Sequence, residues 1–600
     1  MLGQLYLLYV APTDPLFHAV VFVSALTGLT FLKFGLRKTA TSDAIPWYDW
    51  VLVLLSLVPM VYVYNDYDAF VRRSSMPLTS DILVGVLMVL TLLEAGRRAI
   101  GLVLPVIGIV ALVYALINYI VPGNTGTPLM SYHRVFGTLF MTEVGIYSEP
   151  AQVALRWIFL FLVFGQALLL CGGQELFLQV ALKAAGKRKG GAAYVSIVAS
   201  ALFGTLSGSS MANVLTTGQF TIPLMKRAGY PPRLAGAIEA TASTGGSLTP
   251  PIMAAGALIM AEFTGVPYAT IILAALVPAI LFYIGVGCYV YGATHRLDIT
   301  PTEIESPALG WDTITRFWPV VLGMGWLIYS IVSFLPLERA VLQSTAILFV
   351  GGFVANRSGY SAEAFVIRLK SLTEGIIEVG LACAIAGILV GIILLTGVGI
   401  QVSSFIFRLG QDFLFLSLVL TMLVTIFLGM GVPGIAAYVI TASVVAVPLA
   451  NLGIPILAAH MFIFYFSLFA GLTPPVALSA FAAAGLAGSN PFRTGLQSMV
   501  LALPAYLLAF YFIYQPSLLM IGTPDQIIHS MIGGAIGVAA FAFGSSGALF
   551  NRLGVLSRIA LIVGGIALID GSWMSDVVGA LLILPVVLRQ YRRRSHMMMA

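Results

Sequence analysis

Two stretches rich in glycine, serine and threonine carry the residue types best suited to bind small ions. They contain Ser207, Gly208, Ser209, Ser210 and Asn213 in the first, and Thr244, Gly245, Ser247 and Thr249 followed by Pro250-Pro251 in the second. Hydroxyl, amide and carbonyl oxygens are the ligands that hard cations prefer. A helix that restarts after a break also exposes N–H groups, which favour a carboxylate. The two stretches therefore predict a cation site beside an anion site, although any single hydroxyl could instead bond a carbonyl of its own helix.

Glu239 is an ionisable residue within an apolar stretch, ten residues before Thr249. Ionisable groups inside membrane segments are functional candidates by default, because burying them is costly. Glu239 could carry a coupling proton. The alternative is a helix-end carboxylate paired with Arg233.

The motif of the second stretch occurs twice in the chain. Thr249-Pro250-Pro251 recurs as Thr473-Pro474-Pro475, at an offset of 224 residues (249 to 473), and the serine-rich stretch aligns with a segment that holds Gly431 and Gly434. Broken helices survive in a bilayer only inside protein or beside a wet cavity. Paired breaks in two halves are typical of a transporter binding site, and a duplicated structural helix pair is the alternative.

The elements that hold these stretches must be membrane-spanning helices. Of the 600 residues, 59% are hydrophobic and 9% charged, whereas soluble proteins carry about 25% charged residues. Apolar runs of about 20 residues recur, long enough to cross a bilayer and apolar on every side, which excludes a β-barrel. We expect an all-α polytopic membrane protein with helical hairpins and broken helices. The net charge of +6 lies in short loops and indicates no nucleic-acid partner.

The charges of two equivalent loops indicate that the halves are inverted. Lys226, Arg227 and Arg233 follow the first broken stretch, whereas the matching residues 451–459 carry no charge. Because positive loops stay in the cytoplasm, the two loops are expected on opposite sides of the membrane. Inverted halves around a midplane site favour a carrier with alternating access over a pore.

Apolar runs and the polar stretches between them divide the chain into segments. We expect a four-helix membrane domain at 1–125, a connector at 126–150, a first repeat at 151–297, a linker at 298–316, a second repeat at 317–515, and extra helices with a basic tail at 516–600. The four apolar runs of the first segment lie near 17–36, 49–66, 81–93 and 100–121.

Enzyme signatures do not support catalysis. The sequence has neither the GxxxxGK[ST] loop of ATP-driven pumps nor an HExxH zinc motif. Gly544-Ser545-Ser546-Gly547 matches the short GxSG motif of intramembrane serine proteases, and the only histidine after it, His596, is in the basic tail. We expect no catalytic site and no cofactor beyond a coupling ion, with a hydrolase using Ser546 as the alternative from another class.

The stretch 201–227 resembles the large membrane subunit of TRAP transporters, and more narrowly the TAXI branch, in which small and large membrane subunits are fused. Supporting matches are the segments 47–50, 93–98, 239–246 and 261–268. The resemblance covers roughly residues 45–500 and leaves the helices beyond about 520 without a functional account.

This resemblance implies a multi-pass protein of a bacterial or archaeal cytoplasmic membrane that imports a small carboxylate, such as 2-oxoglutarate or glutamate, by an elevator-like motion. A periplasmic TAXI-type binding protein would deliver the substrate to a monomeric membrane unit, and residues 1–125 would correspond to the small subunit. A carrier without a soluble partner is the alternative within the same class.

The resemblance also implies where coupling ions bind. Sodium sites would map onto Ser207, Asn213, Thr249, Gly431 and Thr473, with Gly208, Ser209 and Gly434 beside them. Many relatives carry an acidic residue after the second-half Gly-Met, but Gly431-Val432-Pro433-Gly434 has none. Coupling to H+ through Glu239 is therefore the alternative to Na+.

Overall fold

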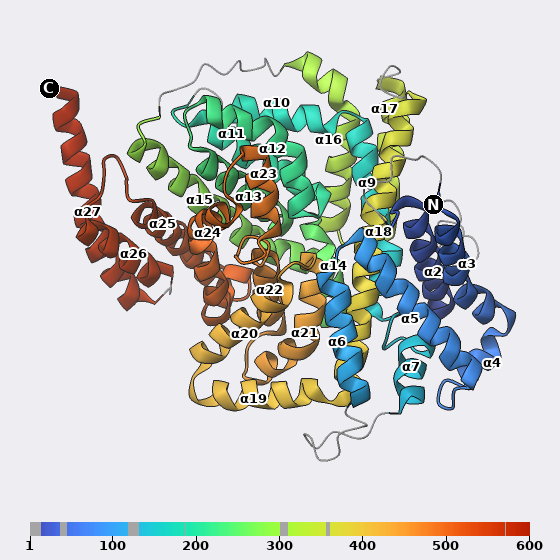
Figure 1. Cartoon of the computed structure of the whole chain (residues 1–600). Helices are drawn as coiled ribbons and strands as arrows, with labels where there is room; N and C mark the ends of the chain where they lie inside the picture. Colours follow the sequence, from blue (N-terminus) through green and yellow to red (C-terminus); the bar gives the residue numbers. More distant parts are fainter. Residues whose placement is uncertain are drawn as a thin grey trace. The chain divides into compact units, whose positions relative to one another are not determined.

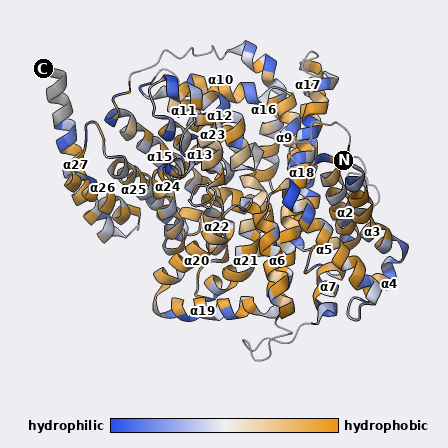
Figure 2. Ribbon diagram, in the orientation of Figure 1, coloured by the Kyte–Doolittle hydropathy of each residue, from blue (hydrophilic) through white to orange (hydrophobic). Residues whose placement is uncertain are grey.

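The chain is described by a computed structural model for residues 14–36, 45–117, 131–185, 188–299, 310–355, 361–569 and 572–599; for 206, 207, 412 and 593–599 the description is of the backbone. Within these residues it forms α-helices joined by short loops, with a single isolated β-bridge and no extended strand (Figure 1). Twelve of the described helices are long and apolar enough to span a membrane. Figure 2 shows hydrophobic residues along most of their length. The predicted all-α polytopic membrane protein is confirmed.

The chain forms two compact units, which we describe separately. The first unit comprises Met1–Gln166, Leu258–Phe263 and Phe365–Gly453, and the second comprises Ala167–Ala257, Thr264–Ala364 and Ile454–Ala600. The segment boundaries expected from the sequence, including those in 126–130 and 300–309 that lie outside the described residues, remain a prediction.

The N-terminal part of the first unit contains the four apolar helices that the sequence predicts. They are α2 (Pro15–Lys33), α3 (Trp47–Asn65), α5 (Thr79–Ala99) and α6 (Val103–Ile117), with the unpredicted short α4 (Tyr67–Arg72) between α3 and α5. Helix α2 begins at a proline, and the Asp14 side chain accepts a hydrogen bond from Leu16 N (2.9 Å), a favourable helix start. A buried ion pair joins α5 to α3, because Arg98 Nη1 lies 2.6 Å from Asp49 Oδ1.

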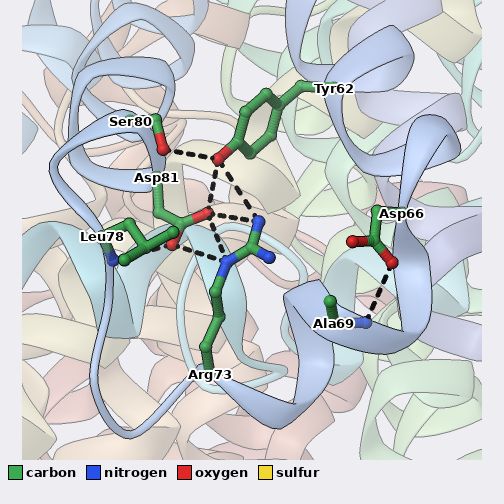
Figure 3. Close-up of polar contacts among 7 residues, drawn as sticks. All are labelled: Tyr62, Asp66, Ala69, Arg73, Leu78, Ser80 and Asp81. Atoms are coloured by element: carbon green, nitrogen blue, oxygen red, sulfur yellow. Dashed lines mark hydrogen bonds and ion pairs between the residues drawn. The ribbon is translucent and has the colours of Figure 1, made fainter.

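A second ion pair fixes the turn between α4 and α5 (Figure 3). Arg73 Nε lies 2.9 Å from Asp81 Oδ2, and the Tyr62 hydroxyl donates to Asp81 Oδ1 (2.8 Å). The same carboxylate accepts from Leu78 N (2.8 Å) at the start of α5. The ends of α3, α4 and α5 are thereby held together by one buried carboxylate.

The rest of the first unit consists of the helices α7 (Tyr132–Met141), α8 (Glu149–Val153), most of α9 (Phe159–Leu170) and α14 (Gly256–Thr264), and α18 (Ala362–Thr396), α19 (Val398–Asp412), α20 (Leu414–Gly429) and α21 (Gly434–Asn451). Glycines let α18 approach its neighbours closely. A Cβ at Gly387 would lie 2.3 Å from Gly145 O, and a Cβ at Gly380 would lie 2.4 Å from the Leu26 side chain. Larger residues at these positions would force the helices apart.

The second unit contains the remaining helices. They are α10 (Gly173–Ala185), α11 (Gly191–Ser207), α12 (Ser210–Arg227), α13 (Pro232–Leu248), α15 (Tyr268–Arg296), α16 (Trp311–Val332), α17 (Leu337–Ala355), α22 (Ile456–Phe469), α23 (Leu478–Ala487), α24 (Pro491–Tyr514), α25 (Pro524–Ser546), α26 (Val555–Ile569) and α27 (Trp573–Met599).

The sequence repeat takes the same helix–break–helix form twice. Helix α12 (210–227) and helix α21 (434–451) have the same length, with both ends displaced by 224 residues. Helix α13 ends at Leu248, directly before Thr249, and α22 (Ile456–Phe469) ends four residues before Thr473; the Pro-Pro peptide bond of each break is cis. The predicted inversion of one half relative to the other remains a prediction.

Candidate functional site

The first predicted ion-binding stretch forms the tip of a helical hairpin. Helix α11 ends at Ser207, α12 begins at Ser210, and the two helices pack against each other (Figure 1). Gly208 supports the turn with φ of +66°, a conformation that favours glycine. Ser209 Oγ accepts from Ala212 N (3.3 Å) and so caps α12. The side chain of Ser207 lies outside the described residues.

The hairpin tip contacts the start of α23, the helix that follows the second Thr-Pro-Pro break, within the second unit. Ser210 Oγ lies 2.8 Å from the hydroxyl of Ser479, at the start of α23. Thr473, in the break itself, donates to Phe469 O (2.9 Å) and lies 2.7 Å from the Tyr506 hydroxyl. The structure therefore brings one residue of the first predicted stretch to the region of the second repeat that holds Thr473.

The second predicted stretch lies at the end of α13, where two of its hydroxyls bond their own helix. Thr244 donates to Ala240 O (2.9 Å) and Thr249 donates to Gly245 O (2.7 Å). Each of these hydroxyls has its one proton committed to its own helix. Within the described part of the chain, the buried Ser247 hydroxyl has no hydrogen-bond partner. Gly245 faces the Phe282 ring, which a Cβ would approach to 2.1 Å.

Asn213 joins three helices at the base of the hairpin tip. Its amide nitrogen donates to Ser200 O on α11 (2.9 Å) and to Ser243 O on α13 (3.5 Å), and its oxygen accepts from Thr217 (3.2 Å) on α12. Helices α11 and α13 approach closely beside it, because neither Gly204 nor Gly246 has a side chain. A Cβ at Gly204 would lie only 2.5 Å from Gly246 Cα. The Asn213 side chain is fully buried and committed to these contacts.

The carboxylate of Glu239 is surrounded by hydroxyl groups from the same three helices. The residue is fully buried. Its Oε1 atom accepts from Ser200 Oγ (2.9 Å), Thr217 Oγ1 (2.5 Å) and Ser243 Oγ (3.2 Å).

The other carboxylate oxygen completes this arrangement. Glu239 Oε2 accepts from Ser196 Oγ (2.7 Å) and from the Thr221 hydroxyl. We call the five donors, Ser196, Ser200, Thr217, Thr221 and Ser243, the hydroxyl cage. None of the ion pairs among the described residues involves Glu239, so the alternative that it pairs with Arg233 is wrong.

The sequence predicted Glu239 as a candidate but none of the five residues of the hydroxyl cage. A signal was present, because each helix contributes two residues four positions apart: 196 and 200, 217 and 221, and 239 and 243. Residues at this spacing share one face of a helix. Only the packing of three helices shows that the three faces meet.

Gly431 and Gly434 belong to the first unit. Gly431 lies in the break between α20 and α21 with φ of +73°, and Gly434 begins α21. Their predicted role beside the residues of the second unit remains a prediction. Among the described residues, no group of three or more His, Cys, Asp or Glu side chains is placed to hold a metal ion.

Ser546 does not have the surroundings of an activated nucleophile in the part of the chain that is described. Its buried hydroxyl donates to the carbonyl oxygens of Phe543 (3.0 Å) and Ala548 (3.3 Å) at the end of α25. The side chain of His596, the histidine that follows in sequence, lies outside the described residues. Nothing in this geometry supports the hydrolase alternative.

Comparisons with known proteins agree on one family. Residues 87–527 match the family model of the tripartite ATP-independent periplasmic transporter, DctM component. The chain is 27% identical over 242 residues to the C4-dicarboxylate TRAP transporter large permease protein DctM of Vibrio cholerae, covering 39% of this chain and 50% of that protein. It is 28% identical over 206 residues to the sialic acid TRAP transporter permease protein SiaT of Haemophilus influenzae, covering 34% of this chain and 31% of that protein.

A further relative is the uncharacterized protein y4mL of Sinorhizobium fredii, 26% identical over 245 residues that cover 40% of this chain and 55% of that protein. The chain therefore spans about half the length, or less, of these curated relatives.

Proposed function

This chain belongs to the DctM component family of tripartite ATP-independent periplasmic (TRAP) transporters, and from that membership we propose that it is the membrane unit of a secondary importer for a small carboxylate. A periplasmic binding protein delivers the substrate, and a Na+ or H+ gradient drives uptake across the inner membrane. The observation that carries the proposal is the helix break at a Thr-Pro-Pro motif, which occurs twice inside the region that matches the family. Paired breaks of this kind are typical of transporter binding sites.

A carboxylate substrate is supported by the chemistry of the breaks. Short helices restart after them, at α14 and α23, and the positive end of a helix dipole favours an anion. The names of relatives specify C4-dicarboxylate, sialic acid and 2,3-diketo-L-gulonate, all of which are carboxylates. Dicarboxylates such as 2-oxoglutarate, or amino acids such as glutamate, are our proposed substrates.

The finer assignment concerns the N-terminal helices. The family match begins at residue 87, within α5, and leaves α2, α3 and α4 outside it. These helices suit a fused small subunit, as in the TAXI branch. We extend the proposal to a TAXI-type binding protein, a monomeric membrane unit and an elevator-like movement of the inverted repeats.

Proposed ligands for the substrate and the coupling ion are the residues predicted from the sequence: Ser207, Gly208, Ser209, Ser210, Asn213, Thr244, Gly245, Ser247, Thr249, Gly431, Gly434 and Thr473. Neutral hydroxyl and carbonyl oxygens, such as those of Thr249 and Thr473, are ligands that suit a sodium ion. A bound sodium would supply positive charge for a substrate carboxylate. Asn213 is the least suited of the set, because its amide already joins three helices.

Uptake into proteoliposomes tests the proposal. Radiolabelled 2-oxoglutarate and glutamate are offered with and without the cognate binding protein, first under a sodium gradient and then under a proton gradient. Uptake that requires both the binding protein and a gradient supports the proposal. Gradient-driven uptake that does not require the binding protein favours the stand-alone carrier. No uptake in any arm, from protein that is folded and inserted, counts against these substrates.

A further inference from the structure

Glu239 differs from the other buried carboxylates of the described residues in having no cationic partner. Asp49 is paired with Arg98, and Asp81 is paired with Arg73. A carboxylate that is buried without a cation either loses its charge or requires several hydrogen-bond donors. Glu239 has five hydroxyl neighbours, which can donate hydrogen bonds to the charged carboxylate and can also accept one from the neutral carboxyl group.

Three of the five hydroxyls, those of Ser196, Ser200 and Ser243, donate to the Glu239 carboxylate. Among the described residues none of the three bonds a carbonyl of its own helix, and Ser200 Oγ also lies 3.2 Å from Thr217 Oγ1. These three donors hold the carboxylate in place whether or not it is charged, since each carboxyl oxygen has more than one lone pair.

The two threonines of the hydroxyl cage have a second acceptor within reach. Thr217 Oγ1 lies 2.8 Å from Asn213 O, and Thr221 Oγ1 lies 3.1 Å from Thr217 O, which is the ordinary back-bond of a helical threonine. Each hydroxyl has only one proton to donate. Each threonine therefore donates its one proton either to Glu239 or to another acceptor, which is a carbonyl of its own helix or, for Thr217, the Asn213 side-chain oxygen at 3.2 Å.

These alternatives accommodate both protonation states of Glu239. When the carboxylate is ionised, all five hydroxyls donate to it. When it is protonated, its O–H donates to a threonine oxygen, and that threonine turns its proton to the helix carbonyl. No polar group of the cage is left unsatisfied in either state, so one proton can bind or leave without breaking the packing of the three helices.

The cage is too tight for a metal ion between its oxygens. An ion of the size of calcium lies about 2.3–2.6 Å from each of its oxygens, so two oxygens on opposite sides of it are much farther apart than that. Here the oxygen–oxygen distances are only 2.5 Å (Glu239 Oε1 to Thr217 Oγ1) and 2.7 Å (Glu239 Oε2 to Ser196 Oγ). A proton is the cation that fits this geometry.

The charged and titratable side chains of the neighbouring helices do not bond the Glu239 carboxylate within the described part of the chain. The helices packed against α13 are α11, α12, α15, α22, α23 and α24. Their titratable or charged residues, together with the one other on α13, are Tyr194; Lys226 and Arg227; Arg233; Tyr268, Tyr283, Cys288, Tyr289, Tyr291, His295 and Arg296; His460 and Tyr465; and Arg493, Tyr506, Tyr511 and Tyr514, with none on α23. Within the described residues, none of these side chains hydrogen bonds or ion pairs with the Glu239 carboxylate, although Tyr283 is close enough to interact with its charge.

We propose that Glu239 is the proton-binding group of this transporter and that Thr217 and Thr221 are positioning residues that exchange hydrogen-bond partners as the proton binds and leaves. The proton enters from the periplasmic side, neutralises the carboxylate and is released to the cytoplasm. The inference rests on the proposed transport function and names its coupling ion as H+. Because both threonines lie on α12, protonation changes the hydrogen bonds between the hairpin and α13.

Infrared difference spectroscopy tests proton binding without any substrate. The purified full-length chain in lipid is titrated with acid, and we expect a protonated-carboxyl band that appears reversibly and is absent from E239Q. The band should shift in T217V, return toward its wild-type position in T217S, and be unchanged in T216V, because the half-buried Thr216 donates to Ala212 O of its own helix (2.8 Å) and does not contact Glu239. Absence of a band that E239Q removes, or a band that does not titrate, would overturn the proposal.

A transport assay provides the second test and separates the proposed role of Glu239 from the proposed transport function. Proteoliposomes with binding protein and 2-oxoglutarate are driven by a proton gradient, and E239Q should lose net uptake while retaining exchange of labelled for unlabelled substrate. Wild-type net uptake by folded E239Q would overturn the role of Glu239 and leave the transport function intact. Should the wild-type chain itself not transport 2-oxoglutarate, the proposed function fails for this substrate, and the infrared result still decides whether Glu239 binds a proton.

Discussion

Thr217 Oγ1 on α12 lies 2.5 Å from Glu239 Oε1 on α13, so a hydroxyl of the hairpin directly contacts the one buried carboxylate without a cationic partner among the described residues. The adjacent Thr216 is half-buried, and its hydroxyl donates to Ala212 O of its own helix. One position along the chain thus separates a hydroxyl that joins two helices from a hydroxyl that does not. Which helical face a threonine of α12 lies on therefore decides whether its hydroxyl contacts Glu239.

Asn213→Ala is expected to destabilise the protein as well as to reduce uptake. The amide donates to carbonyls on α11 and α13, and its loss removes the contacts of a fully buried polar group, at a cost of about 1–3 kcal/mol. The thermal unfolding midpoint should fall in Asn213→Ala and stay at the wild-type value in Thr216→Val. An unchanged midpoint in Asn213→Ala would show that the amide does not hold the three helices together.

Sequence reasoning predicted the helices and their breaks because those follow from local features. Apolar runs set the spans, and the Thr-Pro-Pro motifs at 249 and 473 set the breaks. The short α4 was missed because six residues carry too little periodicity to be distinguished from a loop.

The surroundings of Glu239 could not be predicted in the same way. Arg233 was the nearest cation in sequence, but six residues turn a helix by about 600°, which places the two side chains about 120° apart around the axis. The true partners come from three helices and are joined by packing, which no single segment encodes. Their spacing of four residues was visible, but it also occurs in helical threonines that bond only their own backbone.

The buried ion pair of the N-terminal helices gives a prediction with a matched control. Arg98 and Asp49 lie 2.6 Å apart with side chains 2% and 1% exposed, whereas the Arg97 side chain, which pairs with Glu94, is 39% exposed. Removing one partner of a buried pair costs about 3–5 kcal/mol, and removing a surface partner costs about 0–1 kcal/mol. Arg98→Ala should therefore unfold at a much lower temperature than Arg97→Ala. Similar midpoints for the two variants would contradict the burial of the Arg98–Asp49 pair.

Ser546→Ala should leave uptake at the wild-type level. The serine hydroxyl bonds carbonyl oxygens at the end of α25, outside the region that matches the family. Uptake in proteoliposomes and cleavage of a fluorescent membrane-peptide substrate are measured together. A proteolytic activity that disappears in Ser546→Ala would revive the hydrolase alternative and argue against our reading of α25.

The close approach of α11 to α13 leads to the sharpest steric prediction. A Cβ at Gly204 would lie 2.5 Å from Gly246 Cα and 2.7 Å from the Asn213 amide nitrogen, and neither the backbone atom nor the committed amide can move without separating the helices. Overpacking of this kind costs about 1–3 kcal/mol. Gly485→Ala is the control, because no atom lies within 4 Å of its Cβ position, and alanine favours a helix by about 0.5–1 kcal/mol over glycine. We expect Gly204→Ala to lower the unfolding midpoint and to abolish uptake, since separated helices can no longer keep the hydroxyl cage around Glu239. A Gly204→Ala variant that is as stable and active as Gly485→Ala would mean that the hairpin does not need this contact, and that the cage tolerates a looser arrangement than the one seen here.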